Sequence, residues 1–250
     1  MPRANRHFLP GYVWHITQRC AGRSFFLRFR RDRRRWCFWL NQVRQRYGLR
    51  VLNYIVTSNH VHLLVRDRGR GEISASLQLL SSRVAQEFNN RKGRHGPFWE
   101  GRYHATAVET DSHLLRCITY IDLNMVRAGV VDHPGAWPES GYYELRQNCQ
   151  RYVRTDYADL MQLLSCRNKV ELKALREAAI SEELSLGGLE RDSNWSDSLA
   201  IGTEGFVTRI HERLGLNPSY RAISTTIRDS SSNRRHRTVK ALIYRQKMTL

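Results

Sequence analysis

The sequence predicts an α+β fold of the ferredoxin-like type, a βαββαβ unit with an antiparallel sheet and helices on one face. Short runs rich in aromatic and β-branched residues alternate with segments whose apolar residues recur at helical spacing. Two of the extended runs are separated by only two residues, which is a hairpin spacing. With 250 residues, 41% of them hydrophobic, the chain is long enough to bury a core around such a sheet. In this topology we expect the first and third strands to lie centrally.

The first strand is expected at residues 12–19, where aromatic and β-branched side chains alternate across the two faces. A helix follows, with Asp32 as its expected N-cap and Gly48 as its stop. The start of this helix is rich in arginines that are suited to phosphate contacts, with a solvated helix end as the alternative: Arg28, Arg30, Arg31, Arg33, Arg34 and Arg35.

The hairpin is formed by residues 49–57 and 60–66, and its second arm begins with His60 and His62. Alternate side chains of a strand share a face, so both imidazoles are expected to point the same way. Two neutral imidazoles on one rigid face are half of a metal site. Packing within the sheet and a structural zinc site are the alternatives. His15 is expected nearby, as an ordinary sheet histidine or as a support for the pair.

A second amphipathic helix is expected around residues 77–88, followed by a stop at Gly93 and a fourth strand at about 102–108. These two elements complete the βαββαβ order.

The third helix is expected to begin after Asp111 as N-cap and to stop at Gly129. Tyr120 and Asn124 lie four residues apart in this helix and would share one face. The helix would therefore present a phenol and an amide together. Local hydrogen bonding by Asn124 within the helix is the alternative.

Beyond residue 148 the pattern weakens. Helices are expected at 156–165, 169–180 and 202–215, with a linker-like segment at 181–198. Residues 221–245 are basic with few apolar anchors, which suits a flexible or DNA-ordered tail. We therefore predict two parts: a domain at residues 1–148 and a helical, basic extension at 149–250 that supports DNA binding.

The chain carries 41 Lys and Arg against 23 Asp and Glu, a formal net charge of +18, and this excess indicates a polyanionic partner such as nucleic acid. No signal-peptide pattern and no long apolar run is present, so neither secretion nor membrane insertion is expected. The five cysteines include no C-x-x-C pair, which fits a reducing cytoplasm. A phosphate-binding G-x-x-x-x-G-K-[ST] loop is also missing, so no nucleotide cofactor is expected.

Three segments, YIVTSNHVHLLV, FNNRKGRHGPFWEGRY and CITYIDLNMVRAGVV, resemble in order and spacing the HUH-type single-tyrosine transposases. The nearest branch is that of the REP-associated tyrosine transposases of bacterial chromosomes. The resemblance covers about residues 10 to 145.

This resemblance implies a metal-dependent single-stranded DNA endonuclease and strand transferase that acts on hairpin-forming repeats. It implies that His60, His62 and Asn124 hold a divalent ion, Mg²⁺ or Mn²⁺, and that Tyr120 attacks the scissile phosphate to leave a 5′-phosphotyrosine. Relatives include monomers and homodimers, and the protein is expected at the nucleoid. Five arginines are candidate DNA contacts, with a structural role as the alternative for the first two: Arg102, Arg127, Arg31, Arg34 and Arg35.

Two other functions stay open on the sequence alone. The first is a non-catalytic, domesticated protein that binds hairpin DNA or RNA through the sheet. The second is a structural protein stabilised by zinc.

Overall fold

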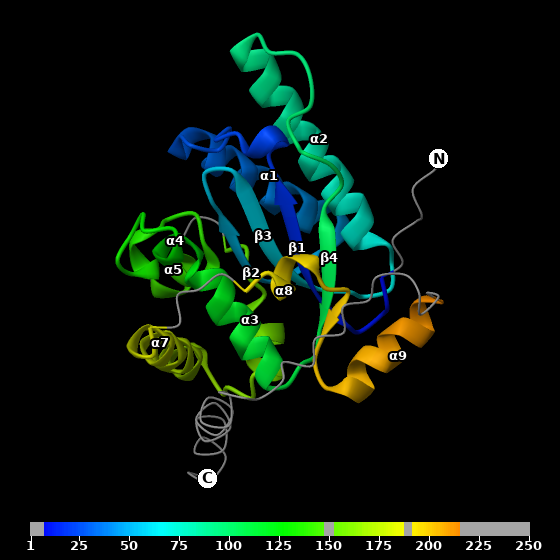
Figure 1. Cartoon of the computed structure of the whole chain (residues 1–250), viewed down its shortest axis with the longest axis vertical. Coiled ribbons are helices and arrows are strands. Elements are labelled where there is room, and N and C mark those ends of the chain that lie inside the picture. Colours follow the sequence, from blue (N-terminus) through cyan, green and yellow to red (C-terminus); the bar gives the residue numbers. More distant parts are fainter. Residues whose placement is uncertain (1–7, 148–152, 188–191, 216–250) are drawn as a thin grey trace.

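The computed structural model describes residues 8–147, 153–187 and 192–215 (Figure 1). Its first part follows the predicted order of strand, helix, strand, strand, helix, strand. These elements are β1 (Val13–Arg19), η1 (Ala21–Arg23), α1 (Arg30–Tyr47), β2 (Arg50–Val56), β3 (His60–Arg66), α2 (Glu72–Lys92) and β4 (His104–Val108). The α+β fold class is therefore confirmed.

The strands form one sheet in the order β2-β3-β1-β4-β5, with β1 and β3 in the interior as predicted. The first four strands pair antiparallel, and the register places Thr17 of β1 opposite His62 of β3. The short fifth strand, β5 (Ala200–Ile201), joins β4 in parallel and was not predicted from the sequence. β3 pairs with β2 on one side and with β1 on the other, so the histidine pair lies on one of the most constrained strands.

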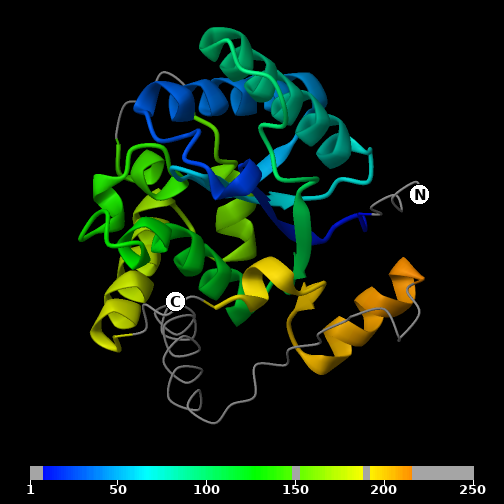
Figure 2. The same cartoon turned by 45° about the horizontal axis from the view of Figure 1, so that its top comes forward.

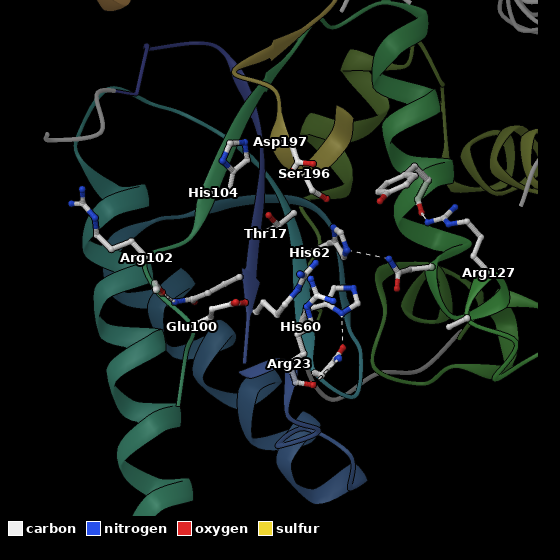
Figure 3. Close-up of a pocket in the computed structure, with 17 residues that line it drawn as sticks. Thr17, Arg23, His60, His62, Glu100, Arg102, His104, Arg127, Ser196 and Asp197 are labelled. Atoms are coloured by element: carbon white, nitrogen blue, oxygen red, sulfur yellow. Dashed lines mark hydrogen bonds between the residues drawn. The ribbon is translucent and has the colours of Figure 1, made fainter. Parts of the chain in front are cut away.

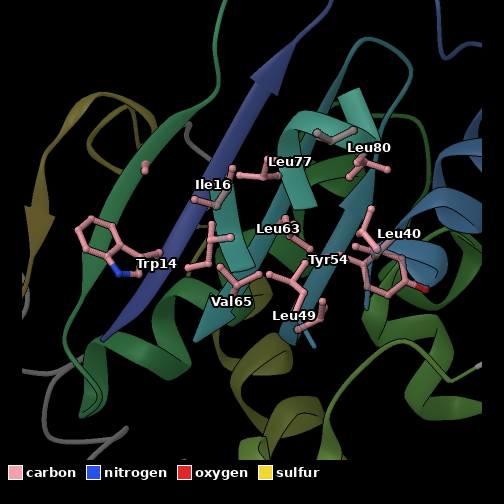
Figure 4. Close-up of a cluster of buried hydrophobic side chains, with 14 of the residues drawn as sticks. Trp14, Ile16, Leu40, Leu49, Tyr54, Leu63, Val65, Leu77 and Leu80 are labelled. Atoms are coloured by element: carbon pink, nitrogen blue, oxygen red, sulfur yellow. The ribbon is translucent and has the colours of Figure 1, made fainter. Parts of the chain in front are cut away.

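Both faces of the sheet are covered. Helices α1 and α2 lie side by side over one face, where Trp14, Ile16 and Leu63 contribute to the core (Figures 2 and 4). The helix α3 (Ser112–Asp122) packs on the opposite face together with helices of the extension, around a second core that includes Leu64 and Ile118. Residue alternation along the strands thus supplies two cores, and the histidines of β3 belong to the face that α3 covers.

The predicted N-cap of the first helix is wrong. Phe29 precedes the helix in an extended conformation, and Asp32 lies inside the first turn without capping the helix end. The Asp32 carboxylate is buried and forms an ion pair with Arg91 of α2. A buried carboxylate is stabilised by a charged partner, and that partner comes from a helix far away in the sequence. The predicted stop at Gly48 is confirmed, since this residue adopts a left-handed conformation with φ of 70°.

The predicted N-cap of the third helix is confirmed, because the side chain of Asp111 accepts a hydrogen bond from the backbone N–H of His113. The helix does not continue unbroken to Gly129 as predicted. It is interrupted at Leu123, where ψ is 2°, and a short helix α4 (Asn124–Arg127) follows. At this break the guanidinium of Arg127 donates a hydrogen bond to the carbonyl of Tyr120. A side chain therefore holds the helix end next to the tyrosine.

The extension adds helices to the second core and one strand to the sheet. Two predicted helices are confirmed as α6 (Tyr157–Leu163) and α7 (Lys169–Ser185). The segment expected to be a linker contains helical residues, since α7 continues to Ser185 and α8 (Asn194–Asp197) lies within it. The remaining elements are η2 (Pro134–Ala136), α5 (Gly141–Arg146) and α9 (Glu204–Leu214), the last as predicted.

The expected boundary at residue 148 and the expected basic tail at 221–245 lie outside the described residues. Among the residues that the structure does describe, no helix has both the length and the apolar character needed to cross a bilayer.

Candidate active site

A cleft of about 570 Å³ opens at the N-terminal end of β3 and is lined by residues from both sheet and helices (Figure 3). It brings together four residues that the sequence singled out: His60, His62, Tyr120 and Asn124. Arg102 and Arg127 also line it. The histidines of β3 therefore share one cavity with Tyr120 and Asn124, which follow them by more than 50 positions in the sequence.

His60 is held by the turn that precedes it. Its Nδ1 lies 2.9 Å from Oγ1 of Thr57 and 2.8 Å from Oδ1 of Asn59. The hydroxyl of Thr57 also donates to the backbone carbonyl of His60. These bonds fix the orientation of the imidazole and engage one ring nitrogen, so Nε2 is the nitrogen suited to bind an ion.

His62 is held from two sides. Its Nδ1 lies 2.9 Å from Nε2 of His15, and its Nε2 lies 3.0 Å from Nδ2 of Asn124. Because an amide nitrogen only donates, Nε2 of His62 is the acceptor and Nδ1 carries the proton. His62 then donates this proton to His15. This tautomer leaves the lone pair of Nε2 on the side of Asn124.

His15 is the buried support of this pair. It is fully inaccessible to solvent, and burial lowers its pKa to about 3. A neutral imidazole has one nitrogen that accepts, which is what the Nδ1 proton of His62 requires. Of the two roles expected for His15, an ordinary sheet histidine or a support for the pair, the contact with His62 favours the second. The signal is its parity with Thr17 on β1, which puts both on the face of the histidine pair.

Tyr120 lies in an aromatic and cationic environment. Its ring centroid is 5.8 Å from that of His62, with the two planes at 82°. The guanidinium of Arg127 lies 4.1 Å from the ring centroid, and the indole of Trp195 stacks against the ring at 5.8 Å. Burial lowers the pKa of Arg127, yet the group keeps its proton under ordinary conditions. The phenol is therefore positioned by a permanent cation and an indole.

The predicted DNA-contacting arginines fall into two groups. Arg102 and Arg127 line the cleft, whereas Arg31 and Arg35 line a second pocket of about 510 Å³ between α1 and α2. Arg34 is exposed on α1, and Arg35 forms an ion pair with Glu87. The structure thus does not bring the α1 arginines into the cleft.

The side chains of the cleft fit a divalent ion. Each histidine has its Nδ1 engaged by a neighbour, which is the usual arrangement around imidazoles that bind metals through the other nitrogen. The amide oxygen of Asn124 would supply a hard ligand once the amide turns over, since its nitrogen now faces His62. The imidazoles alone would favour zinc over magnesium.

A second cluster of metal-binding groups lies at the start of α3, away from the cleft, and consists of Glu109, Asp111 and His113. Asp111 is already the N-cap of α3, and Glu109 accepts two hydrogen bonds from Thr203. These bonds account for both carboxylates structurally.

Sequence reasoning missed the residues that α8 contributes. Trp195 packs against both Tyr120 and His15, and Ser196 and Asp197 line the cleft. The segment around α8 was interpreted as a linker because four helical residues are too few to show helical periodicity. The aromatic residue in a polar stretch was the only available signal.

A strand-borne histidine pair that faces a helix-borne tyrosine in a basic cleft is an arrangement suited to a DNA-processing enzyme. Residues 11–124 match the family of IS200-like transposases. This part of the chain, 114 of its 250 residues, is therefore similar to that family, and it contains both histidines, the tyrosine and Asn124.

Two solved structures resemble the chain. A REP-associated tyrosine transposase bound to a REP hairpin is 19% identical, with 62% of this chain and 94% of that chain covered and a TM-score of 0.48. A candidate transposase from Deinococcus radiodurans R1 is 16% identical, with 43% and 86% covered and a TM-score of 0.34. A search of curated proteins finds no match.

Proposed function

We propose that this protein is an IS200-like transposase, and that it acts as a metal-dependent single-stranded DNA endonuclease and strand transferase through a 5′-phosphotyrosine at Tyr120. The observation that carries the proposal is the shared cleft, in which the phenol ring lies 5.8 Å from His62 and Asn124 contacts the same imidazole. A nucleophile beside a potential metal site, within a basic surface, is suited to phosphoryl transfer.

The nucleophile needs help to react at neutral pH, because an ordinary phenol has a pKa of about 10. The guanidinium of Arg127, 4.1 Å from the ring centroid, would supply positive charge near the phosphate that the phenol attacks. His60 and His62 through Nε2, and Asn124 through its amide oxygen, would hold Mg²⁺ or Mn²⁺. When bound, the ion would polarise the phosphoryl oxygens and neutralise charge in the transition state.

The proposed reaction requires no external energy source. The Tyr120 oxygen forms a bond to phosphorus while the bond from phosphorus to the 3′ oxygen breaks, and the 3′ oxygen leaves and takes up a proton. One phosphodiester is exchanged for another, so a second 3′-hydroxyl can attack the phosphotyrosine and reseal the strand. This fits a chain without a nucleotide-binding loop.

The proposed substrate is single-stranded DNA that folds into a hairpin, bound by a monomer or a homodimer. The walls of the cleft carry Arg19, Arg23 and Arg102, which would face the phosphates of the bound strand. The net charge of +18 would increase the rate of encounter with DNA at low salt.

The test is incubation of the purified chain with labelled hairpin DNA and Mn²⁺, followed by denaturing electrophoresis. We expect a protein-DNA adduct with the wild type, none with Tyr120→Phe, and unchanged hairpin binding by that variant. Tyr143→Phe is the matched control, because this half-buried tyrosine of α5 lies outside the cleft. An adduct with Tyr120→Phe would refute the nucleophile. Hairpin binding by the wild type without any adduct would support the non-catalytic alternative.

A further inference from the structure

The loop between β1 and α1 exposes two phenylalanine rings. Phe25 is 65% and Phe29 is 58% exposed. Phe26, which lies between them in the sequence, packs instead against Phe88 and Phe98, at ring-centroid distances of 5.2 and 5.3 Å. One aromatic residue thus anchors the loop, and two stay in solvent, where large apolar groups are costly unless a partner covers them.

This loop is bound tightly to the turn that carries the histidine pair. The backbone N–H of Cys20 donates to Asn59 at 2.8 Å, and that of Leu27 donates to Ser58 at 2.9 Å. The side chain of Asn59 donates in turn to the carbonyl of Arg23. The exposed rings are therefore held at a constant position relative to His60, which follows Asn59 directly.

Arg23 connects the loop to the cleft. It lines the cleft and lies beside His60 in Figure 3. Its φ of 57° is in the left-handed region, which is unfavourable for a residue with a side chain and is often retained at binding sites. Phe25 follows Arg23 by two residues in the same loop, and it is exposed.

Positive charge lies close to the ring of Phe29. The guanidinium of Arg28 and the ammonium of Lys92 each lie 5.9 Å from the centroid of Phe29. Arg31 is exposed on the first turn of α1. Within the described part of the chain, Arg23, Arg28, Arg31 and Lys92 take part in no ion pair with a carboxylate. Their charge is thus available to neutralise phosphates.

We propose that this surface, which we call the loop patch (Arg23, Phe25, Arg28, Phe29, Arg31 and Lys92), binds unpaired nucleotides next to the scissile phosphate. The bases stack on Phe25 and Phe29 while the cations contact the backbone. The proposal rests on the proposed function in taking single-stranded DNA as the ligand of the cleft. Bases of a duplex are already stacked on one another and cannot stack on the rings, so the patch binds unpaired nucleotides in preference to a duplex. Self-association through the patch would bring like charges together.

The test measures binding by fluorescence anisotropy in a Tyr120→Phe background with chelator, so that cleavage does not interfere. The probes are a labelled oligothymidylate of about 15 nucleotides and a duplex of the same length. We expect Phe25→Ala and Phe29→Ala each to weaken single-strand binding about tenfold, and the pair about 100-fold, with little effect on the duplex. Phe25→Trp and Phe29→Trp should retain binding, because an indole also stacks on bases.

The matched control is Phe38→Ala. Phe38 is 39% exposed further along α1, where its ring lies against Arg35, and single-strand binding should be unchanged. Equal loss on both probes, or no loss, would overturn the proposal. A fall in oligomeric state in sedimentation, with unchanged single-strand binding, would instead assign the patch to self-association. The catalytic proposal is tested separately: it fails if the protein with wild-type loop residues and Tyr120 forms no adduct with hairpin DNA.

Discussion

Nε2 of His15 lies 2.9 Å from Nδ1 of His62, and this bond joins the two central strands of the sheet inside the second core. Asn124 contacts the other nitrogen of the same imidazole. The proton of His62 is thereby placed on Nδ1, which is the tautomer that leaves Nε2 able to bind an ion. A buried neutral histidine thus determines which nitrogen of its neighbour faces the cleft.

Replacing His15 should weaken ion binding without removing a ligand. We expect His15→Ala to lower Mn²⁺ affinity about 10- to 100-fold, because His62 loses the acceptor for its Nδ1 proton. His15→Gln, whose amide oxygen can accept the same proton, should recover part of the affinity. Calorimetric titration with Mn²⁺ measures both variants. Equal losses would mean that His15 acts through packing alone.

Removal of the metal should stop the reaction and leave the fold intact. The two cores consist of apolar side chains on both faces of the sheet, and the proposed ligands lie at the border of a cleft. We expect chelator to abolish adduct formation while the thermal unfolding midpoint shifts by no more than a few °C. A collapse of the midpoint on chelation would support the zinc-stabilised structural protein.

Arg176 should be essential for stability. Its guanidinium is buried, forms an ion pair with Asp122 at 2.7 Å and donates to Asn53 at 3.1 Å, so it connects α7 to α3 and β2. Arg176→Met leaves the Asp122 carboxylate buried and unpaired, at an expected loss of about 3–5 kcal/mol in the free energy of unfolding. Denaturant titration measures this loss. A companion variant with Asp122→Leu as well should recover much of it.

The loss should depend on pH with a defined sign. Burial already raises the pKa of Asp122, and removal of the guanidinium raises it further. The folded variant therefore binds a proton that the unfolded chain releases at a pKa of about 3.9. Its stability falls as the pH rises from about 4 through the folded pKa. A deficit that is the same at about pH 4 and pH 7 would contradict a charged origin.

Cysteine reactivity offers a test of the core. Burial raises the pKa of both Cys20 and Cys37 to about 12, and the thiols of Cys117 and Cys166 are also buried. In a Cys149→Ser variant, chosen because residue 149 lies outside the described residues, alkylation at about pH 8 should be at least ~100-fold slower in native than in denatured protein. Mass spectrometry counts the labels. Rapid native labelling would show that these cores open readily.

Much of the fold was predictable because its signals are local. Alternation of period two identified the first strand, a two-residue hairpin spacing identified the second and third, and the glycines at positions 48 and 93 marked helix ends where a left-handed conformation is needed. Tyr120 and Asn124, four residues apart, both line the cleft, although the helix between them is broken at Leu123.

The errors share one origin. Asp32 looked like an N-cap because its neighbours form a helix, but its partner is Arg91, 59 residues away. Two-residue β5 and four-residue α8 are too short to carry a periodic pattern, and each is held by contacts with β4 or the core. No local rule indicates such contacts.

Local sequence patterns were enough to predict the βαββαβ order, the shared face of His60 and His62, the pairing of a phenol with an amide, and the basic character that suits DNA. Contacts between distant segments established that His15 supports His62, that Trp195 and Arg127 pack against the ring of Tyr120, and that the phenylalanines of the loop patch stay exposed. Periodicity and capping depend on residues within a turn or two. The environment of a catalytic group depends on which distant segments pack against it, and that is determined by burial across the whole chain.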